Sequence, residues 1–314
     1  MTVPMAFAGS DVVVRAEHAC FGGVQGFYEH HSVAVGGPMR FGLFQPAASH
    51  RGQRVPLLVC LAGLTCTDDT FAIKAGAQRL ADQLGIALLT PDTSPRHVRF
   101  DGDADSWDFG VGAGFYLDAT QAPWSQTYQM ERWLMDELLP LLATAHGVDG
   151  DRIGITGHSM GGHGALTLAL RHPLRFTSVS ALAPICAPRL VPWGQKAFAK
   201  YLGPDEQAWR THDTCALLDD GARFPGPAPL VDQGLADKFL VEQLRPEALE
   251  QTASRVGQPL ILRRHAGFDH GYFFIQSVVD DHLRHHAGAW ALSVGQTQGT
   301  MDPGWSARRE MGSR

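Results

Sequence analysis

Hydrophobic and polar positions alternate in two different periods along most of the chain from Arg54 onward. Apolar runs of strand length occupy residues 55–61, 86–91, 152–156, 229–231 and 259–264. Segments with the period of an amphipathic helix lie at residues 71–84, 128–145 and 164–171. Apolar strands that alternate with helices are typical of a parallel sheet covered on both faces. The pattern therefore predicts an α/β fold with a mostly parallel central sheet.

The two ends of the chain differ from this middle region. Residues 12–15 and 39–44 alternate apolar and polar positions, which predicts an antiparallel hairpin at the N-terminal edge of the sheet. From Val294 the periodicity is lost, and residues 295–314 are polar and rich in glycine. We therefore expect one domain over residues 1–290 and a flexible C-terminal tail over residues 291–314.

Composition and charge narrow the class of ligand. Hydrophobic residues make up 44% of the chain and the mean hydropathy is −0.10, as in globular proteins. A net charge of −6 provides no basic surface for nucleic acid or for an anionic membrane. The apolar runs are also far shorter than the roughly 20 residues that span a bilayer. We expect a small-molecule substrate, no nucleic acid and no membrane segment.

The cysteines indicate a reducing compartment. They are odd in number, widely spaced and without a CxxC pair: Cys20, Cys60, Cys66, Cys186 and Cys215. Such a set does not suit a disulfide framework. Residues 6–8 imitate a signal-peptidase site, but no positive and apolar region precedes them. The expected location is the cytoplasm.

A serine between two glycines is the first candidate for chemistry. Gly157-x-Ser159-x-Gly161 follows a predicted strand and precedes a predicted helix, which is the context of a nucleophile elbow. Glycine is needed on both sides because a β-carbon would collide with neighbouring backbone in so sharp a turn. The alternative is a glycine-rich loop in which Ser159 only caps the next helix.

A serine nucleophile requires a histidine base, which in this fold follows the serine and the acid in the chain. His270 lies in a glycine-flanked loop after the predicted strand 259–264, and this position favours it as the base. His265 is the nearest rival. It lies at the end of the strand and lacks the glycine-flanked turn.

Two aspartates compete for the acid position after the predicted strand 229–231. Asp237 lies further into the loop, which suits a reach to His270, whereas Asp232 at the strand terminus suits a role in fixing the turn. The sequence therefore favours Asp237. Asp269 is adjacent to the histidine and points elsewhere in most backbone conformations.

The negative charge of a tetrahedral intermediate requires fixed hydrogen-bond donors. These are usually the N–H after the nucleophile and an N–H from the loop after an early strand. Met160 supplies the first, and Leu64 is the expected second donor. Cys66, in the same loop as Leu64, is interpreted as a small buried filler rather than a catalytic group.

Three further patterns resemble metal or phosphate sites without meeting their requirements. Residues 101–105 begin like a calcium-binding EF-hand, but Ser106 and Gly112 stand where glycine and glutamate are required. Residues 110–114 lack the spacing of a phosphate loop, which indicates a tight loop beside the pocket. Three histidines at helical spacing are better explained by a solvated helix end than by metal ligation: His282, His285 and His286. We expect no metal and no cofactor.

Together with these motifs, further segments of the chain resemble the S-formylglutathione hydrolases of the esterase D family. The resemblance covers roughly residues 20–287. The resemblance lies in residues 20–23, 61–67, 91–96, 106–110, 112–116, 157–166, 183–186, 192–194, 232–234 and 268–270. Such an array is far more specific than the serine motif alone. It implies an α/β-hydrolase fold and the hydrolysis of S-formylglutathione to glutathione and formate.

The resemblance also implies a set of site residues. The family's triad falls on Ser159, Asp237 and His270, and its oxyanion donors fall on Leu64 and Met160. Two departures concern Ala236, where relatives often carry a second aspartate, and the tail beyond Ala289. A homodimer is a further family expectation.

The same residues are compatible with other functions. The triad does not by itself separate thioesters from oxygen esters, so a broad carboxylesterase for small acyl esters is the nearest alternative. An acyltransferase of the same fold would instead place the acyl group on a sugar or an alcohol. A non-catalytic binding module usually lacks a triad member, whereas all three are present here.

Overall fold

Nine strands form one sheet in this computed structural model, which describes residues 11–144 and 147–298. Their order across the sheet is β1-β2-β3-β5-β4-β6-β7-β8-β9. They are β1 (Val13–Cys20), β2 (Gly23–Ser32), β3 (Gly37–Gln45), β4 (Val55–Leu61), β5 (Ala87–Pro91), β6 (Val148–Gly157), β7 (Ser178–Leu182), β8 (Leu230–Gly234) and β9 (Ile261–His265). Strands β4 to β9 are parallel, and β1 to β3 are antiparallel. The mostly parallel sheet is confirmed.

The antiparallel edge contains a strand that the sequence pattern did not reveal. β2 lies between β1 and β3 and pairs with both. The predicted hairpin between residues 12–15 and 39–44 is therefore wrong, because β1 and β3 are not neighbours. Polar side chains such as Gln25 and His30 are buried in β2, which removes the alternation that would have marked it.

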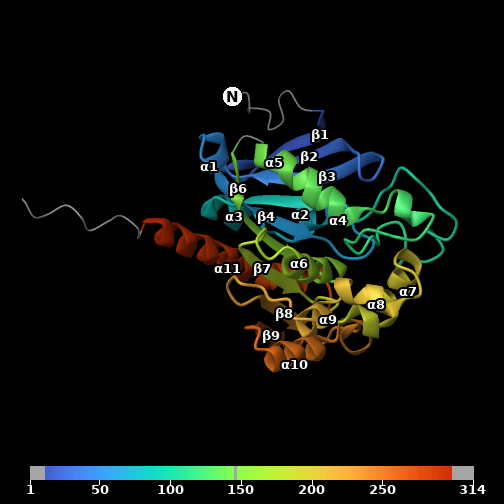
Figure 1. The fold of residues 1–314 in the computed structure, drawn as a ribbon. Helices are drawn as coiled ribbons and strands as arrows, with labels where there is room; N and C mark the ends of the chain where they lie inside the picture. The colour runs from blue at the N-terminus through green and yellow to red at the C-terminus, as the bar shows by residue number, and fades with distance from the viewer. Residues whose placement is uncertain (1–10, 145–146, 299–314) are drawn as a thin grey trace, which may run out of the picture.

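Helices cover both faces of the sheet (Figure 1). They are α1 (Ala47–His50), α2 (Thr70–Lys74), α3 (Gln78–Leu84), α4 (Met130–Arg132), α5 (Leu139–Thr144), α6 (Met160–Arg171), α7 (Pro192–Tyr201), α8 (Glu206–Trp209), α9 (Thr214–Asp219), α10 (Pro246–Val256) and α11 (Tyr272–Gln298). α6 and α11 lie on opposite faces of β7. Val179 contributes to a cavity beside α6, whereas Ser178 and Ser180 hydrogen-bond to His286 of α11. Successive side chains of a strand point to opposite faces, so both faces are covered here.

Several predicted helices have different bounds. The single helix expected over residues 71–84 is divided into α2 and α3, because Gly76 between them has a φ of +72° and interrupts the helix. The segment expected over residues 128–145 consists of α4, a π-helical stretch (Trp133–Leu138) and α5. The helix predicted to begin at residue 164 begins at Met160, directly after the serine motif.

The C-terminal helix is longer than its sequence pattern indicated. α11 continues to Gln298, through residues 291–298 that were expected to belong to the tail. Ala291 and Leu292, at the start of this segment, have high helix propensity and continue a helix that is already packed against the sheet. The rest of the expected tail, residues 299–314, and the small-residue pattern at residues 6–8 lie outside the described residues. Within the described ranges, no helix combines the length and apolar character needed to cross a membrane.

Candidate active site

Ser159 occupies a sharp turn between the end of β6 and the start of α6. Its φ of 58° and ψ of −117° are values that a residue with a β-carbon rarely adopts. The Ser159 N–H donates to the Leu182 carbonyl at 2.9 Å, which ties the turn to β7. These features are those of a nucleophile elbow.

The two glycines of the motif are required by close backbone contacts. A β-carbon on Gly157 would lie 2.2 Å from the Gly161 carbonyl oxygen, and one on Gly161 would lie 2.1 Å from the Leu61 carbonyl oxygen. Both distances are too short for a contact between non-bonded atoms. The steric role expected of these glycines is therefore confirmed.

Asp237 and His270 are brought together by the loops that follow β8 and β9. His270 Nδ1 lies 2.6 Å from Asp237 Oδ2. Asp237 also accepts from Gln233 Nε2 at 3.2 Å and from the Phe239 N–H at 2.8 Å. Its side chain is fully buried, whereas that of His270 is 16% exposed. The carboxylate is thus held in one orientation toward an imidazole that solvent or substrate can reach.

His158 connects this pair to the elbow. It directly precedes Ser159, and its ring centroid lies 4.6 Å from that of His270. Because Asp237 occupies Nδ1 of His270, Nε2 is the ring nitrogen available to the serine side. Burial, together with the nearby His270, holds the pKa of His158 well below its usual value, so His158 adds no positive charge beside the imidazole.

The rival acid and base pair with each other instead. Asp232 lies inside β8 rather than in a turn, and it accepts hydrogen bonds from Arg263, His265 and His282. Burial would raise the pKa of Asp232, but the Arg263 and His282 hydrogen bonds lower it well below its usual value. The turn-fixing role expected for Asp232 is therefore wrong, and the residue is the centre of a buried ionic cluster.

The histidines of α11 are not a solvated helix end. His282 and His286 are buried at 1% and 0% exposure. His286 Nδ1 and Nε2 lie 2.6 and 2.9 Å from the hydroxyls of Ser178 and Ser180. His285 Nε2 lies 3.2 Å from the Val179 carbonyl oxygen. The expectation fails because α11 extends well beyond these residues and packs them against the sheet. In the described parts of the chain, no group of three or more His, Cys, Asp or Glu side chains is placed to hold a metal ion.

The expected oxyanion donors belong to two segments that meet at Ser159. Met160 opens α6, so its N–H precedes the helix's own hydrogen-bond ladder and is available to a ligand. Gly63 precedes Leu64 and comes so close to the elbow that an added β-carbon would lie 3.2 Å from Ser159 Cβ. Leu64 therefore lies next to the serine. These positions suit the two donors.

The glycine-rich residues 110–114 support the loop that carries Leu64. The Thr65 N–H donates to the Gly112 carbonyl at 2.9 Å. A β-carbon on Gly112, whose φ is +78°, would lie 2.9 Å from Thr65 Cα. The segment is thus a tight loop beside the site, as its spacing indicated.

Cys66 is only half-buried, and so it is not a core residue. Burial raises the pKa of its thiol, while the charge of Lys74 acts in the opposite direction. Its carbonyl accepts from Thr93 Oγ1 at 2.5 Å and from Arg96 Nη2 at 2.8 Å. The backbone of Cys66 therefore anchors the loop, and its thiol lies among groups of the site.

Aromatic residues that the sequence did not single out surround the site. Phe239 meets His270 edge to face at 5.1 Å, and Tyr272 meets His158 at 5.7 Å. Tyr116 donates to the Ala62 carbonyl at 2.9 Å beside the elbow. Their contacts join segments far apart in the chain, so only the glycine-rich context of Tyr116 offered any signal.

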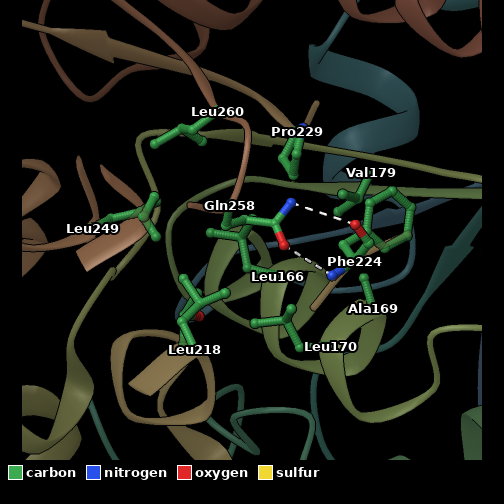
Figure 2. Close-up of a pocket in the computed structure, with 12 residues that line it drawn as sticks. Leu166, Ala169, Leu170, Val179, Leu218, Phe224, Pro229, Leu249, Gln258 and Leu260 are labelled. Carbon is green, nitrogen blue, oxygen red and sulfur yellow. Dashed lines mark hydrogen bonds between the residues drawn. The ribbon is translucent and has the colours of Figure 1, made fainter. Parts of the chain in front are cut away.

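A separate cavity lies at the far end of α6, away from Ser159 (Figure 2). Its lining is mostly aliphatic and includes Leu166, Leu170 and Leu249. The side-chain amide of Gln258 in its wall bonds to both backbone groups of Phe224. The volume of about 20 Å³ is that of roughly one water molecule. This space is a packing gap rather than a substrate pocket.

An elbow serine, a histidine and a buried carboxylate form the arrangement that transfers acyl groups through a serine ester. Together with the mostly parallel sheet, it defines the class of the protein as an α/β-hydrolase. The family model described as "Putative esterase" matches residues 32–290. The chain belongs to this esterase family.

Individual proteins similar to this chain are consistent with membership of this esterase family. The chain is 47% identical over 272 residues to the S-formylglutathione hydrolase of Paracoccus denitrificans, which covers 87% of this chain and 96% of the relative. The solved S-formylglutathione hydrolase of Agrobacterium tumefaciens superposes with a TM-score of 0.85 at 43% identity, over 88% of this chain and 99% of that one. A serine hydrolase of Staphylococcus aureus, FphF, has a TM-score of 0.66 at 17% identity, over 84% and 98% of the two chains, and so shares the fold.

Proposed function

We propose that this protein hydrolyses S-formylglutathione to glutathione and formate. Ser159 is the nucleophile, His270 is the base, and Asp237 is the carboxylate of the triad that orients the base. The observation that carries the proposal is the 2.6 Å contact between Asp237 and His270 beside the elbow. It occurs in a chain 47% identical to an S-formylglutathione hydrolase.

Acylation begins when Ser159 Oγ attacks the formyl carbon while His270 Nε2 takes the hydroxyl proton. Asp237 holds the imidazole by Nδ1 and stabilises the imidazolium that forms. The carbonyl oxygen becomes an oxyanion that the N–H groups of Leu64 and Met160 stabilise. Its collapse breaks the C–S bond. A thiol with a pKa of about 8.5 is a good leaving group, so it needs little help from the protonated His270.

Deacylation repeats the chemistry with water. The departing glutathione thiolate takes up the proton that His270 removed from Ser159, so His270 is neutral again. It then takes a proton from a water molecule that attacks the formyl ester of Ser159. The same donors stabilise the second oxyanion. The intermediate collapses to formic acid as His270 returns its proton to Ser159 Oγ, and the formic acid ionises to formate in solution. The cycle consumes one water and needs no cofactor.

The test is formate release from S-formylglutathione by the purified protein, beside Ser159→Ala and with a short aryl ester as a second substrate. We expect rapid thioester turnover that the variant loses. Turnover of the aryl ester alone would keep the serine mechanism and assign the protein to the carboxylesterases. Equal turnover by Ser159→Ala would reject the nucleophile.

We also propose a cytoplasmic location and a homodimer. All five cysteines are free, which suits a reducing compartment, and glutathione is abundant in such compartments. Cell fractionation and light scattering test the two statements separately.

A further inference from the structure

The chain contains only four lysines, Lys74, Lys196, Lys200 and Lys238. Lys196 is engaged by both carboxylate oxygens of Asp108 at 2.8 Å. Lys200 lies over the Phe109 ring at 4.3 Å. Lys74 and Lys238 are both exposed, and among the described side chains neither forms a salt bridge.

Both exposed lysines lie over aromatic rings that belong to the site. The Lys238 ammonium is 4.8 Å from the centroid of Phe239, whose ring meets His270 at 5.1 Å. The Lys74 ammonium is 5.8 Å from the centroid of Tyr272, whose ring contacts that of His158 at 5.7 Å. A hydrogen bond of 2.7 Å from Gln276 Nε2 to the Lys74 carbonyl fixes the end of α2 against α11.

The order of the strands places these two cations on opposite sides of Ser159. Lys74 ends α2, which follows β4, and Lys238 lies in the loop after β8. In the sheet, β4 lies on one side of β6 and β8 lies beyond β7 on the other. The carboxyl ends of parallel strands meet at one edge, so both lysines and the serine after β6 lie along that edge.

This placement of one cation on each side of the serine suits the glutathionyl leaving group. Glutathione carries its sulfur on the central residue and a carboxylate at each end of the tripeptide. An extended chain reaches about 3.5 Å per residue, so the two carboxylates project to either side of the sulfur. The flexible stem and three donors of a lysine suit the capture of a carboxylate whose exact position varies.

We propose that Lys74 and Lys238 bind the two terminal carboxylates of the glutathionyl group, one on each side of Ser159, and thereby set the preference for glutathione thioesters. This inference rests on the proposed function and deepens it. The two lysines bind the leaving group and are not part of the proton-transfer machinery. Phe239 and Tyr272 supply apolar surface beneath the bound peptide.

The experiment compares Lys74→Ala, Lys238→Ala and the double variant with the wild type on S-formylglutathione and on a short, uncharged aryl ester. We expect each single change to lower the ratio of kcat/KM for the thioester to kcat/KM for the ester roughly threefold to tenfold. The change should lie in KM, because such binding is equal in the ground and transition states. Lys74→Arg and Lys238→Arg should recover most of the ratio.

Two controls separate charge recognition from altered folding. Lys200→Ala removes a lysine whose ring contact is with Phe109 and should leave the ratio unchanged. S-methylglutathione, which cannot be hydrolysed, should inhibit aryl-ester cleavage with a Ki that rises about as much as KM in the lysine variants. Its dimethyl ester, which lacks both carboxylates, should inhibit wild type and variants equally.

The outcomes distinguish this inference from the proposed function. Thioester turnover by the wild type with an unchanged ratio in the double variant would overturn the role of the lysines and leave the function intact. If the wild type does not hydrolyse S-formylglutathione, the function fails. In that case, a Ki of S-methylglutathione that rises in the lysine variants would still support the binding site. A Ki that is the same in the wild type and the variants would overturn the binding site as well.

Discussion

At the scale of single residues, Ser159 combines an unfavourable backbone with strong local support. Its left-handed φ is kept by hydrogen bonds on both sides, from its own N–H to Leu182 and from the N–H of His163 to its carbonyl at 3.0 Å. The strain is a property of the turn rather than of the hydroxyl. Removing the hydroxyl should therefore change reactivity without changing the fold.

The first prediction concerns the nucleophile and the base. Ser159→Ala and His270→Gln should each lower kcat for S-formylglutathione by several powers of ten, as in other serine triads. The midpoint of thermal unfolding should move by only a few degrees. Near-normal turnover by either variant would disprove the assignment.

The second prediction separates the two aspartates. Asp237→Asn should lower kcat by about four powers of ten, because the amide cannot support the imidazolium. Asp232→Asn removes one half of a buried ionic cluster and should lower the free energy of unfolding by about 3 kcal/mol, with kcat of the folded enzyme nearly unchanged. Urea unfolding and steady-state kinetics measure both effects. A larger kinetic loss in Asp232→Asn would show that the acid is misassigned.

The choice between these aspartates shows what a single residue's context in the sequence can and cannot indicate. Their distance from His270 along the chain favoured Asp237, and the structure places its carboxylate against His270 Nδ1. The pairing of Asp232 with Arg263 was not foreseeable, because it depends on the register between β8 and β9. A side chain's face on a buried strand is fixed by its neighbours across the sheet.

At the scale of elements, the loop between β4 and α2 and the start of α6 form a single unit. Gly63 allows the two backbones to approach, Gly112 supports the loop from the other side, and Met160 begins the helix. Each glycine is needed for contact rather than for chain flexibility. The positions of the proposed oxyanion donors therefore depend on packing between three separate segments.

The third prediction tests this packing. Gly63→Ala would place a β-carbon 3.2 Å from Ser159 Cβ and 3.4 Å from His158 Nδ1, so the loop or the elbow must move slightly apart. We expect kcat to fall about a hundredfold because the Leu64 N–H no longer faces the oxyanion. As a control, Gly288→Ala in α11 meets no atom within 4 Å and should stabilise the fold by about 0.5–1 kcal/mol with unchanged kcat. Wild-type kcat in Gly63→Ala would contradict the proposed donor.

At the scale of the whole molecule, burial of uncharged histidines should make stability depend on pH. Burial lowers the pKa of His163 to about 3 and that of His212 to about 4. Burial also lowers the pKa values of His158 and His286 well below the ordinary 6.5. Asp118 acts in the opposite sense, because burial raises its pKa to about 6 and the folded state takes up its proton first.

The fourth prediction follows from this balance. Above about pH 6.5 these histidines are neutral in both states, but at lower pH the unfolded chain takes up protons that the folded chain excludes. Each buried neutral histidine should therefore lower the free energy of unfolding by about 1.4 kcal/mol for every pH unit below 6.5, until the pH reaches its pKa in the folded state. We expect the free energy of unfolding in urea to fall steeply between pH 7 and pH 5. In His163→Leu, the slope of the free energy of unfolding against pH should fall by the amount that one proton contributes. An unchanged slope would contradict the burial of a neutral His163.

The sequence by itself determined the α/β class, the elbow and the chain order of its candidate serine, acid and base. These features depend on local periodicity and on steric demands within a few residues. Only the tertiary structure decided that β2 separates the predicted hairpin strands, that His282 and His286 are buried, and that Lys74 and Lys238 lie on opposite sides of Ser159. Each of these depends on strand order and side-chain burial, which arise from contacts between segments that the linear pattern does not connect.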